Sequence, residues 1–303
     1  MDGSRPDLAS APVRAGAAGE RPASRTAYRV ALRRAVHQVL DVPPVLDDPI
    51  AIPILGEETA AALRKDPSTF ERGPLDDYMR AFMAARSRFA EDHLDAARDR
   101  GVGQYVILGA GLDTFAYRQR RADPPLRVWE IDHPATQRWK RERLAAAGIA
   151  IPANVTYVPV DFEHDTLPDA LARAGFNPSV PTVFAWLGVT PYLTADAIDA
   201  TLAYVATVAG PHGGVAFDYG LERSLLSVAQ KIVFDRLAAR VASAGEPWIT
   251  MFEPAALAAR LRALGFTTIE DAGADDMNAR YFAGRTDGLR VGGMGRMMWA
   301  GCS

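Results

Sequence analysis

Residues 106–118 read VILGAGLDTFAYR, an apolar run that breaks into Gly-Ala-Gly and then into a polar segment that predicts a helix start. The apolar run predicts a buried strand, and open α/β sheets bind their ligands at the carboxyl ends of such strands. Two interpretations follow. Either the turn holds a nucleotide, or it is only a tight corner in which Gly109 and Gly111 adopt positive φ.

The sequence around this turn predicts a single α/β domain over residues 25–303. From residue 104 onward, helical stretches alternate with short β-rich runs, which are QYVILG, LRVWEID, VTYVPVD, TVFAWLGV, GGVAFDY, FTTIEDA and RMMWA. This alternation predicts βαβ units and a doubly wound, mostly parallel sheet in residues 101–303. Residues 25–100 predict helices without a convincing strand, which cap the sheet or form a lid over its ligand crevice.

The composition is that of an ordinary globular protein. The chain has 303 residues, of which 49% are hydrophobic and 23% charged, enough for one large domain. Residues 1–24 are rich in Ala, Pro, Gly, Ser and Arg, so we expect a disordered tail. A transit peptide is the alternative, but the acids Asp2, Asp7 and Glu20 fit it poorly.

Charge and cysteine content exclude several classes of partner. The formal net charge is -3, so no global positive field favours nucleic acid or an anionic membrane. The single cysteine, Cys302, can build neither a disulfide framework nor a cysteine metal site, and we expect no metal. No apolar run approaches the roughly 18 residues of a membrane span. We therefore expect a soluble, cytoplasmic protein, and a homodimer is compatible with the sequence.

The residues after the glycine turn argue against a dinucleotide. The dinucleotide fingerprint needs a third Gly or Ala three residues after the second glycine, and this chain has Thr114 there, next to Asp113. An acid at a helix start repels a pyrophosphate, which needs the positive helix end. The turn therefore favours a ligand without phosphates.

Two acids at strand ends favour an adenosyl group. Asp132 ends the strand LRVWEID, 21 residues after Gly111 (132 minus 111), where a carboxylate can accept bonds from ribose hydroxyls. Asp161 closes the next strand and precedes Phe162, a pair suited to the edge and face of an adenine. Both nicotinamide enzymes and S-adenosylmethionine enzymes carry a ribose acid, so this residue alone does not separate them.

One arginine lies on the apolar face of a predicted helix. At about 100° per residue, Arg86 falls in one stripe with apolar residues, whereas Arg88 points to the opposite side. A charge on an apolar face is costly unless an anion meets it, so Arg86 needs a carboxylate from the protein or from a ligand. A cofactor that carries an amino acid would supply one. The apolar stripe comprises Met79, Phe82, Met83, Ala90 and Leu94.

Several motifs together resemble a known family. From about Tyr78 to the end, the segments GAGLDTFAYR, WEIDHPATQRWK, VPVDFEHDTLPDAL, GFNPSVPTVFAWLGVTPYLT and YFAGRTDGLR are similar to the leucine carboxyl methyltransferase family. The closer likeness is to its bacterial branch of S-adenosylmethionine-dependent methyltransferases. The resemblance implies S-adenosyl-L-methionine as cofactor and a class I methyltransferase fold, a Rossmann-like seven-stranded sheet with an N-terminal helical lid.

The resemblance also implies a cofactor site. Arg86 would bind the cofactor carboxylate, and Asp132 would hold the ribose. The other implied cofactor residues are Gly109 against the methionine portion, Ala110 and Gly111 in the same turn, and Asp161 with Phe162 at the adenine. Where family members have Trp-Glu-Gly after the fourth strand, this chain has AWLGV, so Leu187 occupies a cofactor position without the polar contact of a Glu.

The acceptor side is less defined. Tyr192, in PYLT, matches a family tyrosine near the substrate carboxylate, and His133 and His164 lie next to the two acids, so we name Tyr192 and His133 as candidate catalytic residues. A carboxylate acceptor needs no base, whereas a phenol or an alcohol does. We expect O-methylation of a small molecule in natural-product (secondary) metabolism, with a carboxylate ahead of a phenol or alcohol. The alternatives are a cofactor-binding protein without transfer activity and, less favoured, an NAD-dependent oxidoreductase.

Overall fold

The computed structural model describes residues 24–303, except residues 72, 120, 122–124, 162–163 and 244. The tail predicted for residues 1–24 lies outside the described residues apart from Ser24. The Ser24 hydroxyl accepts a hydrogen bond from the backbone N–H of Ala27 and so caps the first helix, α1 (Arg25–Leu40). In the described part of the chain, no helix is long and apolar enough to cross a membrane.

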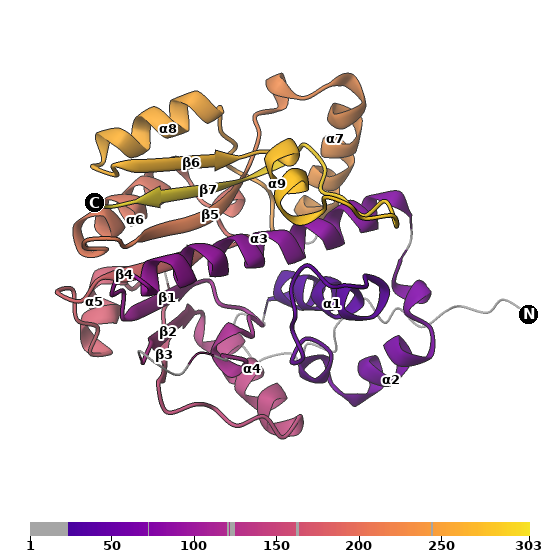
Figure 1. Cartoon of the computed structure of the whole chain (residues 1–303), viewed down its shortest axis with the longest axis horizontal. Helices are drawn as coiled ribbons and strands as arrows, with labels where there is room; N and C mark the ends of the chain where they lie inside the picture. Colours follow the sequence, from indigo (N-terminus) through magenta and orange to yellow (C-terminus); the bar gives the residue numbers. More distant parts are fainter. Residues whose placement is uncertain (1–23, 72, 120, 122–124, 162–163, 244) are drawn as a thin grey trace, which may run out of the picture.

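All seven runs predicted as strands form one sheet, in the order β3-β2-β1-β4-β5-β7-β6 (Figure 1). Neighbouring strands from β3 to β5 are parallel, and β7 runs antiparallel to both β5 and β6. This is the predicted α/β Rossmann-like arrangement, and the fold prediction is confirmed. The strands are β1 (Gln104–Leu108), β2 (Arg127–Asp132), β3 (Val155–Pro159), β4 (Thr182–Trp186), β5 (Gly214–Gly220), β6 (Thr268–Ala272) and β7 (Gly295–Gly301).

The order of the strands creates a switch point at the carboxyl end of β1. The chain passes from β1 to β2 on one side, and β4 pairs with β1 on the other, with Ile107 opposite Ala185. Both β1 and β4 are fully buried, as their uninterrupted apolar runs require. The turn that begins at Gly109 therefore lies beside the residues that follow β4.

Helices cover both faces of the sheet (Figure 1). On one face the apolar side chains of α5 (Leu167–Arg173), α6 (Ala195–Val208) and α8 (Pro254–Ala263) pack against the strands. On the other face α3 (Pro74–Arg98) and α9 (Ala274–Tyr281) share a cluster with Ile107, Ala185 and Ala216, which we call the α3-side cluster. Successive side chains of each strand alternate between the α3-side cluster and the apolar cluster on the opposite face of the sheet.

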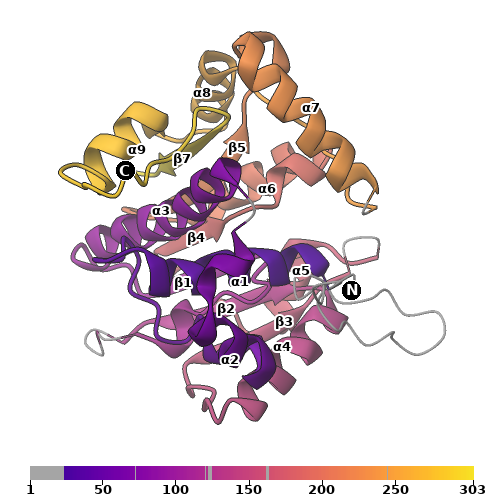
Figure 2. The same ribbon diagram turned by 90° about the vertical axis from the view of Figure 1, so that its right-hand side faces the viewer.

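The helices before β1 divide into two groups. The long helix α3 packs directly on β4, β5 and β7 and so belongs to the core of the domain. By contrast, α1 and α2 (Glu57–Lys65) form a separate apolar cluster with α4 (Pro134–Ala146) beside the carboxyl ends of β1 and β2 (Figure 2). The helix α3 thus caps the sheet, which is one of the two roles expected for residues 25–100, and a lid role for α1 and α2 stays a prediction.

The helix predicted to start at Asp113 does not form, and this prediction is wrong. The described residues contain only the 3₁₀ helix Phe115–Tyr117 at this place. Tertiary contacts override the local helix signal. Thr114 donates a hydrogen bond to Asp48 (2.6 Å), and Arg118 donates one to Glu91 of α3 (2.9 Å). Asp113 satisfies one backbone N–H, that of Phe115, as an isolated cap does.

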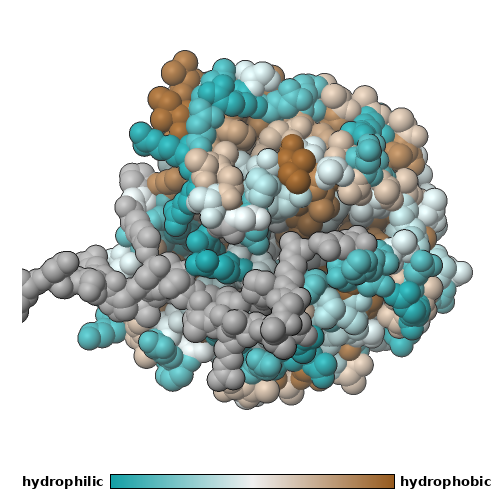
Figure 3. All heavy atoms as spheres, turned by 180° about the vertical axis from the view of Figure 1, so that it is seen from behind, coloured by the Kyte–Doolittle hydropathy of each residue, from teal (hydrophilic) through white to brown (hydrophobic). Residues whose placement is uncertain are grey.

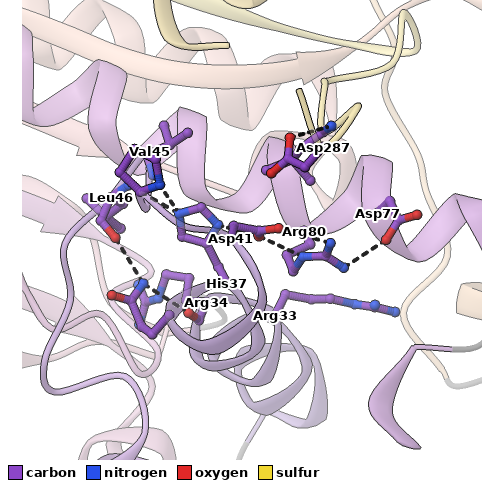
Figure 4. A network of polar contacts seen from close by, with 12 residues as sticks. Arg33, Arg34, His37, Asp41, Val45, Leu46, Asp77, Arg80 and Asp287 are labelled. Atoms are coloured by element: carbon purple, nitrogen blue, oxygen red, sulfur yellow. Dashed lines mark hydrogen bonds and ion pairs between the residues drawn. The ribbon is translucent and has the colours of Figure 1, made fainter. Parts of the chain in front are cut away.

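A buried polar network fixes α1 to α3 (Figure 4). The Nε2 atom of His37 accepts hydrogen bonds from the backbone N–H groups of Val45 (2.9 Å) and Leu46 (3.3 Å), so its Nδ1 atom must be the donor to Asp41 (2.7 Å). Arg80 of α3 donates to the same carboxylate through Nε (2.8 Å). One buried carboxylate thus holds both helices.

One helix after β5 is not buried. None of the described residues of α7 (Val228–Ser243) is buried, although the helix contains several large apolar residues. Its outer side exposes Val228 (78%) and Ile232 (51%). Seen from behind, hydrophobic side chains stand out at the upper left, where α7 lies (Figure 3).

Candidate functional site

The glycine turn after β1 is tightly packed by two other segments. Gly109 has φ +67°, and a Cβ at this position would lie 2.5 Å from Cγ2 of Val189, in the segment after β4. Gly111 has φ +48°, and its Cβ would lie 3.0 Å from that of Ala27 near the start of α1. Both glycines therefore have the positive φ of a tight corner, which is compatible with both interpretations, and the corner lies at the edge of the sheet where such folds bind ligands. Ala110 between them is buried.

Asp132 ties this turn to the end of β2. Its Oδ2 atom accepts a hydrogen bond from the backbone N–H of Gly111 (2.6 Å), and its Oδ1 atom accepts one from that of His133 (2.7 Å). Burial raises the pKa of Asp132, although both hydrogen bonds oppose the shift. Each carboxylate oxygen keeps a second lone pair, which can accept a bond from a ribose hydroxyl.

Arg86 has a carboxylate partner from the protein itself. Its Nη1 atom donates to Oδ2 of Asp218 on β5 (3.0 Å), and both residues are only 5% exposed. The other oxygen, Oδ1, accepts a hydrogen bond from the backbone N–H of Gly188 (2.5 Å). Of the two sources left open by the sequence, the structure contains the protein carboxylate. The hydrogen bond with Asp218 uses one of the five N–H donors of the guanidinium.

Tyr192 lies beside this ion pair, in the 3₁₀ helix Thr190–Tyr192. Its hydroxyl lies near Trp248, and burial raises its pKa. The ring of Trp248 in turn packs against Phe234 of α7, with 5.3 Å between the ring centroids. We call Tyr192, Trp248 and Phe234 the aromatic row. It extends from the ion pair toward α7, and each of its members is half-buried.

Comparison with known proteins identifies the family. The family model for leucine carboxyl methyltransferase matches residues 27–206. A protein of Bacillus subtilis (strain 168), named "Putative S-adenosyl-L-methionine-dependent methyltransferase YktD", is 30% identical over 285 residues, which are 88% of this chain and 93% of the relative. The chain belongs to the leucine carboxyl methyltransferase family.

A second relative carries the same kind of name, and one solved structure has the same fold. A Mycobacterium ulcerans (strain Agy99) protein with the name "Putative S-adenosyl-L-methionine-dependent methyltransferase" is 35% identical over 210 residues, 64% of this chain and 67% of that one. The crystal structure of a "putative methyltransferase" from Thermobifida fusca YX has the same fold, with a TM-score of 0.54 at 17% identity, over 90% of this chain and 94% of that chain. The protein is an S-adenosylmethionine-dependent methyltransferase, which sets aside the nicotinamide alternative.

The residues of this methyltransferase fit the cofactor. Arg86 keeps unused donors for the cofactor carboxylate, and Asp132 keeps lone pairs for the ribose. The absence of a side chain at Gly188 lets the guanidinium of Arg86 lie against the backbone, because a Cβ there would lie 2.9 Å from both Nη atoms. The individual roles implied for Arg86, Gly109 and Asp132 stay predictions.

Other implied positions make contacts within the protein, and their roles at the cofactor stay predictions. Leu187 is half-buried and packs into the α3-side cluster. The backbone N–H of Asp161 donates to Asp165 (3.1 Å), and Phe162 lies outside the described residues. His133 caps α4, because its Nδ1 atom accepts a hydrogen bond from the N–H of Ala135 (3.2 Å). The catalytic role predicted for His133 is therefore not reflected in the contacts of its ring.

Asp218, Trp248 and Phe234 were not predicted from the sequence. Asp218 had the same signal as Asp132, since it follows a buried apolar run near the end of a predicted strand, GGVAFDY. The two aromatic residues carried no such signal. Their position depends on how α7 and the loop behind it pack against the Thr190–Tyr192 turn, where the N–H of Ile249 donates to the carbonyl of Pro191 (2.6 Å).

Proposed function

We propose that this methyltransferase methylates an oxygen of a small molecule, and that the acceptor is a carboxylate rather than a phenol or an alcohol. S-adenosylmethionine supplies an electrophilic methyl group on a sulfonium, and the protein has to align the acceptor and exclude water. A carboxylate, with a pKa of about 4, is ionised at neutral pH, whereas a phenol, with a pKa of about 10, needs a base.

The state of Tyr192 is the observation that carries this proposal. Burial raises the pKa of its hydroxyl, so the side chain is neutral at physiological pH and is no base. The indole of the nearby Trp248 can only donate, so Trp248 leaves the proton of the Tyr192 hydroxyl available for another acceptor. A neutral phenol beside the Arg86–Asp218 ion pair can donate a hydrogen bond to a carboxylate acceptor, but it cannot take a proton from an alcohol.

His133, the other candidate base, is engaged elsewhere. Its Nδ1 lone pair accepts the backbone N–H of Ala135 at the start of α4. This contact orients the ring as a helix cap. The two residues nominated as catalytic therefore support an acceptor that needs no deprotonation.

The aromatic row supports an apolar acceptor. Tyr192, Trp248 and Phe234 present half-buried rings between the ion pair and α7. Half-buried aromatic surface next to a few polar groups is typical of sites for small organic ligands. We propose an apolar carboxylic acid of natural-product metabolism as the acceptor.

The chemical stability of the product tests this proposal. The full-length protein is incubated with S-adenosylmethionine labelled in its methyl group and with apolar carboxylic acids, each paired with the phenol or alcohol of the same skeleton. A methyl ester is cleaved by mild alkali and releases labelled methanol, whereas a methyl ether is stable. We expect alkali-labile label from the acids. Alkali-stable label, formed from the phenols or alcohols alone, would show that the acceptor assignment is wrong.

A further inference from the structure

The amino-acid end of S-adenosylmethionine is a zwitterion, and a buried site must match both of its charges. Arg86 can match the carboxylate. We infer that Asp218 binds the α-ammonium group, so that the Arg86–Asp218 pair recognises the whole zwitterion. The inference rests on the cofactor and is independent of the acceptor proposed above.

The sheet places Asp218 at the cofactor edge. Phe217 of β5 pairs with Trp186, the last residue of β4, so Asp218 lies one residue beyond that pair. Its side chain is on the same face as that of Ala216, which belongs to the α3-side cluster. Arg86 reaches it from α3 on that face. The pair therefore lies at the carboxyl edge of β4 and β5, close to the strand switch point.

The hydrogen bonds of the pair leave capacity for a ligand. A carboxylate has about four lone-pair sites. Asp218 uses one for the N–H of Gly188 and one for Nη1 of Arg86. Arg86 uses one of its five donors on Asp218. Unused acceptors and unused donors thus lie side by side, as the ammonium and carboxylate of an α-amino acid require.

The charge balance of the pair also favours a zwitterionic ligand end. The buried pair is neutral as it stands, and a zwitterionic ligand end keeps the site neutral, whereas a ligand with only a carboxylate would add an uncompensated buried charge. In the part of the chain that the structure describes, Asp218 is the carboxylate that forms an ion pair with Arg86. Leu187, next to Gly188, is apolar and offers no anion.

Three ligands separate ammonium recognition from other effects. The probes are S-adenosylhomocysteine, its deaminated analogue in which hydrogen replaces the α-ammonium, and 5′-methylthioadenosine, which lacks the amino acid entirely. Isothermal titration calorimetry measures each Kd for the wild-type protein and for Asp218→Asn. Asp271→Asn is the control, because Asp271 also pairs with an arginine, Arg296 (2.8 Å), but on the edge strand β6, two strands away from β5.

We expect Asp218→Asn to raise the Kd of S-adenosylhomocysteine about 10- to 100-fold, which is the effect of losing one hydrogen bond to a charged group. The deaminated analogue should bind the variant at least as tightly as wild type, because without Asp218 its carboxylate compensates the charge of Arg86, and the Kd of 5′-methylthioadenosine should stay within about twofold. Asp271→Asn should leave all three affinities unchanged.

Two results would overturn the inference. If Asp218→Asn weakened S-adenosylhomocysteine and the deaminated analogue by the same factor, Asp218 would only position Arg86. If the wild-type protein bound these two ligands equally, no ammonium site would exist, and this measurement decides the matter even where the variant does not fold. Neither result bears on the choice of acceptor, so the two proposals fail separately.

Discussion

The guanidinium of Arg86 occupies the space that a side chain at Gly188 would need. A Cβ on Gly188 would lie 2.9 Å from Nη1 and Nη2 of Arg86. The N–H of the same glycine donates to Asp218, the partner of Arg86. Gly188 therefore supports both members of the ion pair, and its lack of a side chain determines where the guanidinium can lie.

Gly188→Ala should displace the guanidinium of Arg86. The Kd of S-adenosylhomocysteine should rise at least about tenfold, which corresponds to one lost hydrogen bond to a charged group. Positive φ alone would strain any alanine, so the control is Gly284→Ala. Gly284 has φ +75°, against +74° for Gly188, and nothing lies within 4 Å of its Cβ position. Calorimetry should show an unchanged Kd for the control. Equal Kd values for both variants would refute the supporting role of Gly188.

Arg86→Lys should weaken cofactor binding although the charge is kept. The lysine ammonium is a single point charge and cannot bond Asp218 and a ligand carboxylate in the planar geometry of a guanidinium. We expect a Kd for S-adenosylhomocysteine at least about tenfold higher. Arg88→Lys, two residues away and exposed, changes only a surface pair with Asp92 and should bind like wild type. An unchanged Kd for Arg86→Lys would rule out a cofactor role for the guanidinium.

The face of Arg86 could be predicted from the sequence, but its partner could not. Helical periodicity places Arg86 in an apolar stripe, and the residue is indeed buried. Asp218 lies 132 residues further along the chain. Only the packing of α3 across β5 brings the two together, and no local pattern encodes that contact. The strand runs, by contrast, were predictable because each is a short β-rich segment between helical stretches.

Two further features depend on contacts between elements that the local sequence does not encode. The helix signal after the glycine turn is overridden by contacts from Thr114 to Asp48 and from Arg118 to Glu91. Glu130 interrupts the apolar strand LRVWEID, yet it is fully buried, because Lys140 of α4 donates to it (2.7 Å). In both cases the deciding partner belongs to another element.

Gly109→Ala should destabilise the protein by more than its φ explains. Its Cβ would overlap Val189, and overpacking of this kind costs about 1–3 kcal/mol. Gly148→Ala is the matched control, because Gly148 has φ +68° against +67° and no atom within 4 Å of its Cβ position. Urea unfolding should show the larger loss for Gly109→Ala and partial recovery when Val189→Ala is added. Without that recovery, the contact with Val189 would not be the cause.

Tyr192→Phe should raise the KM for the acceptor more than it lowers kcat. The hydroxyl is neutral because burial raises its pKa, so the variant loses a hydrogen-bond donor rather than a base. The pH profile of kcat between pH 6 and 9 should keep its shape, and the Kd of S-adenosylhomocysteine should not change. Tyr204→Phe on α6 is the control, since burial also raises the pKa of Tyr204. If the variant lost a rise of kcat with increasing pH that the wild type shows, Tyr192 would be a base.

Asp41→Asn should lower the free energy of unfolding by about 1–3 kcal/mol at pH 7, because the buried Arg80 loses its acceptor at the end of α1 and keeps only Glu71 and Asp77. Burial alone would raise the pKa of Asp41, but hydrogen bonds from His37 and Arg80 outweigh it and hold the pKa below its ordinary value. The stabilisation by this carboxylate is therefore complete above the unfolded pKa of about 4 and is lost as the pH falls through the lower folded pKa.

Chemical denaturation from pH 7 down to pH 3 measures this dependence. The wild-type free energy of unfolding should decrease below about pH 4, and the variant should lose the part of that decrease that Asp41 contributes. Asp77→Asn provides the control, because Asp77 also accepts a hydrogen bond from Arg80 (2.9 Å) but its side chain is 55% exposed. An exposed pair contributes at most about 1 kcal/mol. If both variants lost equal stability at pH 7, the buried carboxylate would not be what fixes α1 to α3.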